Sequence, residues 1–462
     1  MFINREKELE FLEKKWADDQ AQMIILWGKR RVGKTELVKK FIDTKPHVYF
    51  LSEPANEKEQ PRRFSVELGN YYKEPLLTTR GFANWEESFR YIKEKDMKLV
   101  LVFDEFTHLI QANRGITGIF QRLWDEYLSK SRVCLILMGS SVAMMKTEVL
   151  NYKAPLYGRR TGQWKLQPLA FQDVRKFRPG KSFGDHMHHF AAAGGTPAYW
   201  LWLSRKGDFF NNLKSQILTR GEPLYDEVEF ILREELREPR FYFSLLQSIA
   251  LGKRRLGEIV KATGISQPVA NKYSGVLSDL DIIEREIPVT EEKPLKSKKG
   301  LYRFKDEFIQ FWFKFVFPRR GQLEMGQTDK ALEEIKAELP VYLSFIYEKI
   351  AAQIIRQRAD LFFEFEKLGR WWDKNQEIDL VGLNRKQNSL LLGEVKWSRN
   401  PVGVGIFNEL KRKAQLVSWG DSKTRVYYVL FSRSGFTPEM IKLARYEKIS
   451  LYKGDRICLE GR

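Results

Sequence analysis

The stretch that most constrains the fold is MIILWGKRRVGKTELVKKF, which begins at Met23. An apolar run from Met23 to Trp27 is followed by GKRRVGKT and then by apolar residues at helical spacing. A buried strand that turns through glycines into a helix is a unit of parallel α/β sheets. Such a turn gathers backbone N–H groups and a helix N-terminus at one point, which suits a phosphate. The sequence therefore predicts an α/β domain with a phosphate site after this strand.

The residues of this turn match the P-loop pattern G-x-x-x-x-G-K-[ST] in the strand-loop-helix context that the pattern requires. Gly28 and Gly33 allow the backbone to curl around the β-phosphate of a nucleotide. Lys34 supplies positive charge to the β- and γ-phosphates, and Thr35 offers its hydroxyl to Mg²⁺. We therefore predict ATP, ADP and Mg²⁺ as ligands, with a chance match of the pattern as the alternative.

Two further apolar runs end in polar residues. KLVLVFDEF places Asp104 and Glu105 after one run, and RVCLILMGSS places Ser140 after the other. Ligands of open α/β sheets bind at the carboxyl ends of the strands. We expect Asp104 to hold the Mg²⁺ hydration shell, Glu105 to polarise the attacking water and Ser140 to sense the γ-phosphate. The alternative for the acids is a buried strand with a capped end.

The N-terminal half resembles the archaeal ATPase family, a branch of the AAA+-like, STAND-type P-loop switch ATPases. The resemblance rests, in this order, on FINREKELEFL, GKRRVGKT, VLVFDEF, LMGSS, PLYGRRTGQWKLQPL and AAGGTPAYW. It covers most of residues 1–235 and implies that the nucleotide is also contacted by a helical lid.

The resemblance implies further nucleotide contacts. Arg5, with its neighbours Asn4 and Glu6, is expected near the base and ribose. An exposed Arg5 behind an Asn4 cap is the alternative.

The resemblance also implies that Gly194, Gly195 and Pro197 approach the nucleotide from the lid. Arg159 or Arg160 is expected to sense phosphate, because a guanidinium can clamp two γ-phosphate oxygens.

After Phe241 the sequence predicts three short helices and then a β-wing, which together describe a winged helix-turn-helix. Gly264 is expected to end the second helix and Ser266 to cap the third, with Pro268 in its first turn. If the third helix reads DNA, its groove-facing residues and the wing lysines are Gln267, Asn271, Lys272, Ser274, Lys296, Lys298 and Lys299. The alternative is a mechanical part packed on the lid. The following FPRRGQLEMGQTDK is expected to be a linker.

Near the C-terminus, EIDLVGLNRKQNSLLLGEVKWS predicts a β-hairpin that carries Asp379, Glu394 and Lys396 among apolar residues. Alternate side chains of a strand share a face, so Glu394 and Lys396 point the same way. Burying carboxylates without partners is costly, which indicates a bound cation with the lysine as a neighbouring charge. A structural salt bridge is the alternative.

With its flanking helices and strands, this hairpin resembles the PD-(D/E)xK nuclease fold found at the C-terminus of archaeal ATPases. The resemblance implies that Asp379 and Glu394 bind Mg²⁺ or Mn²⁺, and that the Val395 carbonyl completes the site. Lys396 would orient or activate water, and Glu348 would add a third acid beside the metal. A degenerate domain that only binds nucleic acid or protein is the alternative.

Basic residues Arg399, Lys411, Arg412 and Lys413 are expected near the entrance of this site. Over the whole chain, 79 lysines and arginines against 60 acids give a formal charge of +19, which favours DNA or another polyanion. Trp371 and Trp372 could stack on bases, but an apolar anchor beside a strand is the preferred interpretation.

Sequence features also bound the setting of the protein. The N-terminal segment is charged rather than apolar, and runs such as LVLVF fall short of the ~20 residues of a membrane span. We therefore expect a cytoplasmic protein without a membrane partner. Cys134 and Cys458 support neither a disulfide framework nor a thiolate metal site. The histidines of DHMHHF are expected in a solvated helix or loop.

The predicted fold class is α/β with four parts. These are a P-loop parallel-sheet ATPase core (1–170), a helical lid (171–236), a winged helix-turn-helix (237–325) and a C-terminal α/β restriction-endonuclease-like domain (335–462). The expected function is an ATP-hydrolysing switch coupled to DNA binding and Mg²⁺-dependent DNA cleavage. The alternatives are a non-cleaving regulatory ATPase and a DNA-binding platform that forms homo-oligomers through Arg159 or Arg160.

Overall fold

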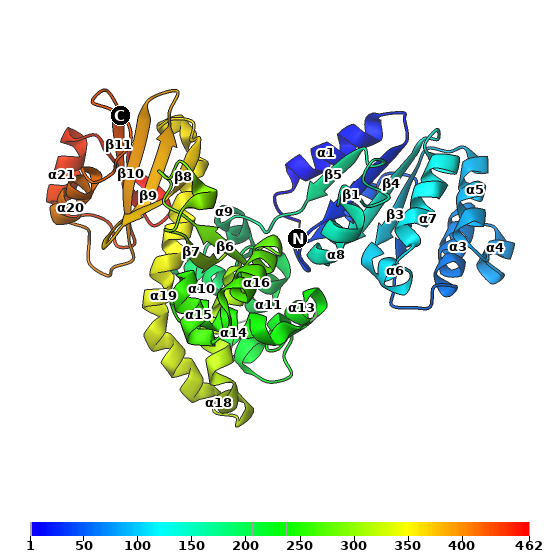
Figure 1. Cartoon of the computed structure of the whole chain (residues 1–462), viewed down its shortest axis with the longest axis horizontal. Helices are drawn as coiled ribbons and strands as arrows, with labels where there is room; N and C mark the ends of the chain where they lie inside the picture. The colour runs from blue at the N-terminus through cyan, green and yellow to red at the C-terminus, as the bar shows by residue number, and fades with distance from the viewer. Residues whose placement is uncertain (1, 206, 237, 462) are drawn as a thin grey trace. The chain divides into compact units, whose positions relative to one another are not determined.

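The computed structural model describes residues 2–205, 207–236 and 238–461, which form two compact units (Figure 1). Unit 1 contains residues 2–169, 196–199 and 229–236. Unit 2 contains the remaining described residues, from 170 onward. The segment 171–236, predicted as one lid, is therefore shared between the two units.

Unit 1 is built on a parallel five-stranded sheet with the strand order β2-β3-β4-β1-β5. The strands are β1 (Gln22–Trp27), β2 (His47–Leu51), β3 (Leu99–Asp104), β4 (Val133–Gly139) and β5 (Gly162–Lys165). β1, β3 and β4 are buried along their whole length, as their continuous apolar runs predict. Since β4 lies between β1 and β3, the residues that follow these three strands meet at one edge of the sheet.

Helices flank this sheet (Figure 1). They are α1 (Glu6–Ala17), α2 (Lys34–Ile42), α3 (Glu59–Tyr72), α4 (Pro75–Thr79), α5 (Trp85–Lys95), α6 (Phe106–Ala112), α7 (Ile116–Leu123) and α8 (Val142–Met144). The core joins Val38 and Phe41 of α2 to Ile24 and Ile136 of the sheet. Burial of this apolar face fixes α2, and with it the turn that precedes α2.

Unit 2 contains most of the remaining helices. From α9 to α13 they are α9 (Phe171–Val174), α10 (Phe183–Ala193), α11 (Pro197–Leu203), α12 (Phe209–Leu213) and α13 (Glu227–Glu235), of which α11 and α13 also contribute to unit 1. Three helices and an antiparallel strand pair follow: α14 (Pro239–Ala250), α15 (Leu256–Thr263), α16 (Gln267–Asp279), β6 (Ile283–Glu286) and β7 (Leu301–Phe304). Gly264 ends α15 with φ +69°, and Ser266 precedes α16 without a side-chain capping bond.

The expected linker FPRRGQLEMGQTDK is wrong. Much of it is helical, because α17 (Glu307–Phe311) continues through irregular helical turns into α18 (Arg320–Glu324), and α19 (Thr328–Arg356) follows. Arg319 binds Glu334 and Glu338 of α19, at 3.0 and 2.5 Å, so the two segments are held together. In the part of the chain that the structure describes, no helix is both long enough and apolar enough to cross a membrane.

The prediction that the histidine cluster is solvated is also wrong. The histidines lie on α10, where His186 is 2% and His189 0% exposed. Their ring nitrogens contact the backbone carbonyls of Arg178, Asp185 and Leu203 at 2.8 to 3.1 Å. Seven of the 11 residues of α10 are buried, which is typical of a buried helix rather than a surface helix.

These buried histidines predict a loss of stability in acid. Burial lowers the pKa of His188 to about 4, and it lowers the pKa of His186 and His189 as well. A histidine with a depressed pKa binds protons better when unfolded, so its stabilising effect is lost as pH falls from about 6.5 through 4. The parent is expected to lose stability between pH 7 and pH 4.5 as His188 becomes protonated. In His188→Gln this loss of stability should be smaller by about 2 kcal/mol. Urea unfolding of the parent and of His188→Gln at both pH values measures this difference, and an equal loss of stability in the two proteins would contradict it.

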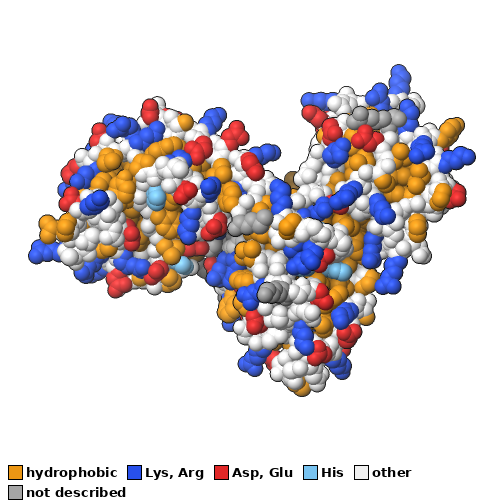
Figure 2. Space-filling model, turned by 180° about the vertical axis from the view of Figure 1, so that it is seen from behind, with side chains coloured by type: hydrophobic (Ala, Val, Ile, Leu, Met, Phe, Trp, Pro, Cys, Tyr) orange, Lys and Arg blue, Asp and Glu red, His pale blue; other side chains and the backbone are white. Residues whose placement is uncertain are grey.

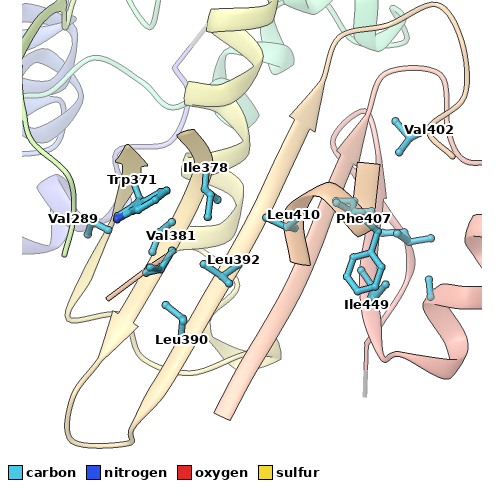
Figure 3. Packing of buried hydrophobic residues seen from close by; sticks show 14 of the residues in the cluster. Val289, Trp371, Ile378, Val381, Leu390, Leu392, Val402, Phe407, Leu410 and Ile449 are labelled. Carbon is cyan, nitrogen blue, oxygen red and sulfur yellow. The ribbon is translucent and has the colours of Figure 1, made fainter. Parts of the chain in front are cut away.

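The C-terminal part of unit 2 is a mixed six-stranded sheet with the order β13-β12-β11-β10-β9-β8. Its elements after α19 are β8 (Lys367–Asp373), β9 (Gln376–Asn384), β10 (Ser389–Lys396), α20 (Val404–Ala414), β11 (Arg425–Ser432), α21 (Pro438–Tyr446), β12 (Ile449–Lys453) and β13 (Arg456–Leu459). Figure 3 shows the core on one face of this sheet, where Leu390 and Leu392 of β10 lie with Phe407 and Leu410 of α20.

Candidate functional site

The P-loop turn between β1 and α2 has the backbone that its glycines allow. Gly28 has φ +150° and Gly33 has φ +97°. A Cβ atom at Gly28 would lie 2.5 Å from the Leu166 carbonyl oxygen, so a side chain does not fit there. The Lys34 ammonium is buried and donates to the Gly28 and Lys29 carbonyls at 3.0 and 3.1 Å. Burial lowers the pKa of Lys34, although Glu105 and Asp104 oppose this effect.

Asp104, at the end of β3, contacts the start of α2. Its Oδ2 atom accepts a hydrogen bond from the Thr35 hydroxyl at 2.9 Å and a short one from the Tyr49 hydroxyl. Burial and this bond to Asp104 raise the pKa of Tyr49. The carboxylate and the hydroxyl that were predicted to face one Mg²⁺ ion are therefore direct neighbours. Tyr49 of β2 was not predicted as a residue of this site. The signal that could have suggested it is the position of β2, which follows the P-loop helix in the sequence and is a plausible neighbour in the sheet.

Glu105 and Ser140 form a second pair at the same edge of the sheet. Glu105 adopts the left-handed region with φ +50°, which turns its side chain toward the end of β4. Its Oε2 atom accepts hydrogen bonds from the Ser140 backbone N–H at 3.2 Å and from the Ser140 hydroxyl at 2.6 Å. The structure thus brings Lys34, Thr35, Asp104, Glu105 and Ser140 together at the ends of β1, β3 and β4.

Arg5 is not the exposed residue of the alternative interpretation, since only 6% of it is accessible. Its guanidinium donates to the backbone carbonyls of Val32 and Gln167 at 3.0 and 2.9 Å, and it pairs with Glu8. Arg5 therefore connects the start of α1 to the P-loop turn. Asn4 precedes it with φ +43°, and α1 shows no side-chain capping bond.

Arg159 and Arg160, which the family resemblance implies as phosphate sensors, contact other residues of unit 1. Arg159 forms a two-pronged ion pair with Asp125, with the closer nitrogen at 3.0 Å. Arg160 donates to the Leu150 carbonyl at 3.4 Å and lies over the ring of Tyr157.

Gly194, with φ +57°, ends α10 beside Glu307, and a Cβ there would lie 2.9 Å from the Glu307 carboxylate. Its carbonyl accepts a bond from the Trp200 indole at 2.7 Å. Gly195 is the last residue of its stretch of unit 2, and Pro197 begins α11. The close approach of Glu307 therefore explains why the first residue of GGTP is a glycine.

The C-terminal hairpin holds its charged residues opposite one another. β9 and β10 pair antiparallel, with Leu383 opposite Leu390 and Val381 opposite Leu392. The same register continued by two residues places Asp379 opposite Glu394. The Asp379 carboxylate accepts from the Val395 backbone N–H at 2.9 Å. Leu392 lies in the same core cluster as Leu410 of α20. Because alternate residues of a strand share a face, Glu394 also lies on the face that α20 covers.

Two lysines bracket the buried Glu394 carboxylate. Lys396 donates to Oε2 at 2.5 Å and lies 3.7 Å from Asp379, while Lys413 of α20 donates to Oε1 at 2.8 Å. Burial would raise the pKa of Glu394, but Lys396 and Lys413 outweigh it and lower the pKa. Burial, Glu348 and Glu394 raise the pKa of Asp379 well above its usual range. Two carboxyls with opposite shifts are typical of sites with divided acid and base roles.

Glu348 does not join these acids as a third ligand. Its carboxylate lies 3.5 Å from the guanidinium of Arg370 on β8, which also contacts Glu286 and Glu377. Burial raises the pKa of Glu348, although Arg370 opposes this effect. Among residues 2–205, 207–236 and 238–461, no group of three or more His, Cys, Asp or Glu side chains could hold a metal. A cation at the hairpin would have Asp379 and Glu394 as its carboxylates and would displace a lysine from Glu394.

The predicted DNA-facing residues are divided by burial. Gln267, Asn271 and Lys272 are exposed on α16, but Ser274 is wrong as a groove-facing residue because it is 0% exposed. It lies on the face of α16 that also carries the buried Ala270 and Leu277.

The three wing lysines are all exposed between β6 and β7. Lys299 pairs with Glu291 at 3.1 Å, whereas Lys296 and Lys298 lie on the open surface. Trp371 and Trp372 are 5% and 8% exposed, which supports the interpretation of an apolar anchor. Figure 2 shows lysine and arginine side chains spread over the visible face among acidic ones.

Comparisons with known proteins match two separate parts of the chain. Residues 2–196 match the family described as an ATPase domain found predominantly in Archaea, and residues 312–413 match archaeal and bacterial proteins of unknown function. An uncharacterized ATP-binding protein of Methanocaldococcus jannaschii is 62% identical over 45 residues, which are 10% of this chain and 76% of that protein. The Walker-type ATPase of Pyrococcus abyssi has a similar fold, with a TM-score of 0.51 and 20% identity, over 68% of this chain and 96% of that chain.

One relative covers nearly the whole chain. It is an uncharacterized protein of Methanocaldococcus jannaschii, 35% identical over 438 residues, which span 94% of this chain and 96% of the relative. The likeness therefore extends through both units and includes the C-terminal sheet. The chain belongs to one family with this Methanocaldococcus jannaschii protein, and it carries the ATPase domain that is found predominantly in Archaea.

Proposed function

We propose that unit 1 binds and hydrolyses ATP and that this reaction switches the state of the protein. The observation that carries the proposal is the meeting of Lys34, the Thr35–Asp104 pair and the Glu105–Ser140 pair at one sheet edge. The family match to an ATPase domain supports it. The turn also fits a polyphosphate, because its backbone curls at two glycines and its buried ammonium donates to two backbone carbonyls that phosphate oxygens could replace.

Each residue then has a definite role. Lys34 would exchange the Gly28 and Lys29 carbonyls for β- and γ-phosphate oxygens, and Thr35 with Asp104 would hold a Mg²⁺ ion that neutralises phosphate charge. Glu105 would accept a proton from, or orient, the attacking water. Ser140 holds Glu105 in place and would sense the γ-phosphate, with Arg159 or Arg160 as the further phosphate sensor.

The nucleotide site also includes groups outside the sheet edge. Arg5 contributes by fixing the P-loop turn through the Val32 carbonyl. Gly195 and Pro197 would form the lid's approach to the nucleotide.

Glu105→Gln tests the assignment of the hydrolytic residue. The substitution keeps the size of the side chain and removes a base that contributes about 100-fold or more to such reactions. We expect ATP binding within a factor of about three of the parent, with turnover reduced at least about 100-fold. Equilibrium binding and phosphate release measure the two quantities. Turnover equal to that of the parent would remove Glu105 from the mechanism.

A second function, cleavage of DNA by the C-terminal domain, is favoured by the position of Asp379, Glu394 and Lys396 on one face of a buried hairpin. The order α19, β8, β9, β10, α20 and β11 supports the nuclease-like assignment. Asp379 and Glu394 would hold Mg²⁺ or Mn²⁺ with the Val395 carbonyl, and Lys396 would orient water at the scissile phosphate. With Glu348 bound to Arg370, a ligand set of three acids does not fit.

DNA binding is proposed for the segment from α14 to β7, whose three helices and strand pair support a winged helix-turn-helix. Gln267, Asn271 and Lys272 would face the groove, and Lys296 and Lys298 would meet phosphate. The net charge of +19 supports a polyanionic partner. Nucleotide state in unit 1 would control this binding and the C-terminal site.

Lys396→Ala tests the cleavage proposal. With supercoiled DNA and Mg²⁺ or Mn²⁺, the parent is expected to cleave and the variant to lose at least about 100-fold in rate. Lys386→Ala is the matched control, because Lys386 is an exposed lysine in the turn of the same hairpin. Absence of cleavage by the parent with intact ATP hydrolysis would favour the non-cleaving regulatory ATPase. A mass increase with a non-hydrolysable ATP analogue would favour the homo-oligomeric platform.

A further inference from the structure

The short segment at the end of α13 belongs to the nucleotide unit although its neighbours in sequence do not. Residues 229–236 group with unit 1, whereas residues 200–228 and those from 238 onward group with unit 2. The chain therefore enters and leaves the ATPase unit through this segment. A change in how α13 is held at the nucleotide site would thus occur in a segment whose neighbours in sequence belong to unit 2.

Glu235 fastens α13 to the loop that follows β4. Its Oε1 atom accepts a hydrogen bond from the Val142 N–H at 2.7 Å. Its Oε2 atom accepts from the Ala143 N–H at 2.9 Å and from the Ser141 hydroxyl at 3.1 Å. Burial raises the pKa of Glu235, so these three donors replace the water that the carboxylate has lost.

These contacts adjoin the residues proposed for hydrolysis. Ser141 directly follows Ser140, whose backbone N–H and hydroxyl both donate to Glu105. One peptide bond therefore joins a donor of Glu105 to a donor of Glu235.

The neighbouring residue Glu234 faces the P-loop itself. Its carboxylate lies 3.8 Å from Arg30, and the charges of both Glu234 and Glu235 act on the Lys34 ammonium. A γ-phosphate next to Lys34 adds negative charge close to these two carboxylates, and like charges repel. Beside them lies a cavity of about 560 Å³, lined among others by Arg114, Met144 and Arg233. A bound γ-phosphate would thus repel these two carboxylates, and the cavity beside them offers space into which they can move.

We propose that Glu235 is a nucleotide-controlled latch. Without a γ-phosphate, Glu235 holds the end of α13 on the Ser141–Ala143 backbone, and binding of ATP releases it. This inference rests on the proposed ATPase function and adds to it the residue that reports the nucleotide state outside the site. Glu235 acts through Ser141 and is therefore a positioning residue.

Hydrogen exchange of the full chain tests the latch in peptides that cover residues 227–236. Parent, Glu235→Gln and Glu148→Gln are compared without nucleotide, with ADP and with a non-hydrolysable ATP analogue. In the parent we expect slow exchange without nucleotide and with ADP, and exchange at least about 10-fold faster with the analogue. Glu235→Gln should exchange fast in all three states. The glutamine amide has only one acceptor oxygen, and its NH₂ group would face N–H donors of the loop, with which it cannot form a hydrogen bond.

Glu148→Gln is the matched control, since Glu148 lines the same cavity and accepts its hydrogen bond from Thr147; it should behave as the parent. ATP affinity supplies a second measurement. A latch that competes with ATP makes Glu235→Gln bind ATP about 3- to 10-fold more tightly, whereas a residue that only supports the loop would weaken binding when replaced.

Three results overturn the latch. They are exchange in 227–236 that is unchanged by a bound analogue in the parent, parent-like exchange in Glu235→Gln, and weaker ATP binding by Glu235→Gln. Failure of the parent to bind the analogue at all would overturn the ATPase proposal together with the latch. Binding without a change in exchange overturns the latch alone.

Discussion

Lys34→Ala is expected to weaken ATP binding at least about 30-fold and to abolish measurable hydrolysis. Lys34 is 5% exposed, and its ammonium donates to the two P-loop carbonyls that a nucleotide would replace as its partners. Loss of one partner of a buried charged contact costs about 2 to 5 kcal/mol, and each 1.4 kcal/mol is a factor of ten in affinity. Equilibrium titration with ATP and a phosphate-release assay measure the two effects.

The control for Lys34→Ala is Lys40→Ala. Lys40 is an exposed lysine on the same helix, α2, so its removal changes the net charge equally but leaves the turn intact. We expect Lys40→Ala to bind and hydrolyse ATP as the parent does. Equal ATP affinity in all three proteins would show that the P-loop turn is not the nucleotide site.

Arg370→Met is expected to destabilise unit 2 by about 3 to 5 kcal/mol. Arg370 is 7% exposed and contacts Glu377 at 2.8 Å, Glu348 at 3.5 Å and Glu286 at 3.6 Å. Burial opposes the charge of Arg370, but the three carboxylates outweigh this and raise its pKa. Removal of the guanidinium leaves the largely buried Glu348 carboxylate without this counter-charge, which is the costly way to break such a network. Urea unfolding at pH 7 measures the change.

Arg385→Met serves as the comparison for Arg370→Met. Arg385 pairs with Glu292 at 2.8 Å, but both side chains are more than half exposed, so its loss should change stability by less than about 0.5 kcal/mol. Addition of Glu348→Gln to Arg370→Met should restore part of the lost stability, since one unpaired carboxylate is then neutral. A loss below about 1 kcal/mol in Arg370→Met would contradict the network.

The parts of the fold that local sequence determines were predictable. The P-loop turn, the acids after β3 and the serine after β4 follow from the rule that strand ends carry ligands, and Figure 1 shows these strands in one sheet. The hairpin of β9 and β10 follows from its alternation and polar turn. Its register, which sets Asp379 opposite Glu394, follows once the turn is placed.

Contacts between distant segments were not predictable in the same way. Tyr49 reaches Asp104 only because β2 pairs with β3, and Glu235 reaches Ser141 across 94 residues of sequence. Ser274 is polar but lies on the inner face of α16, where packing against other helices decides burial.

The position of Lys413 beside the hairpin could have been predicted more closely than as near the entrance of the site. It follows Leu410 by three residues, so both share the face of α20 that packs on the hairpin. The family resemblance implied Glu348 as a metal ligand, and its contact with Arg370 could not be predicted locally because Arg370 lies on a later strand.

The measurement that tests the account most directly is the affinity of the full chain for DNA in three nucleotide states. A labelled duplex is titrated with the parent and with Lys34→Ala at one fixed salt concentration, because ionic strength dominates such affinities. If ATP binding in unit 1 switches the protein, the parent's affinity with a non-hydrolysable ATP analogue should differ at least about 10-fold from that with ADP. Lys34→Ala should show no difference. Equal affinity of the parent with the analogue, with ADP and without nucleotide would contradict an ATP-controlled switch that acts on DNA.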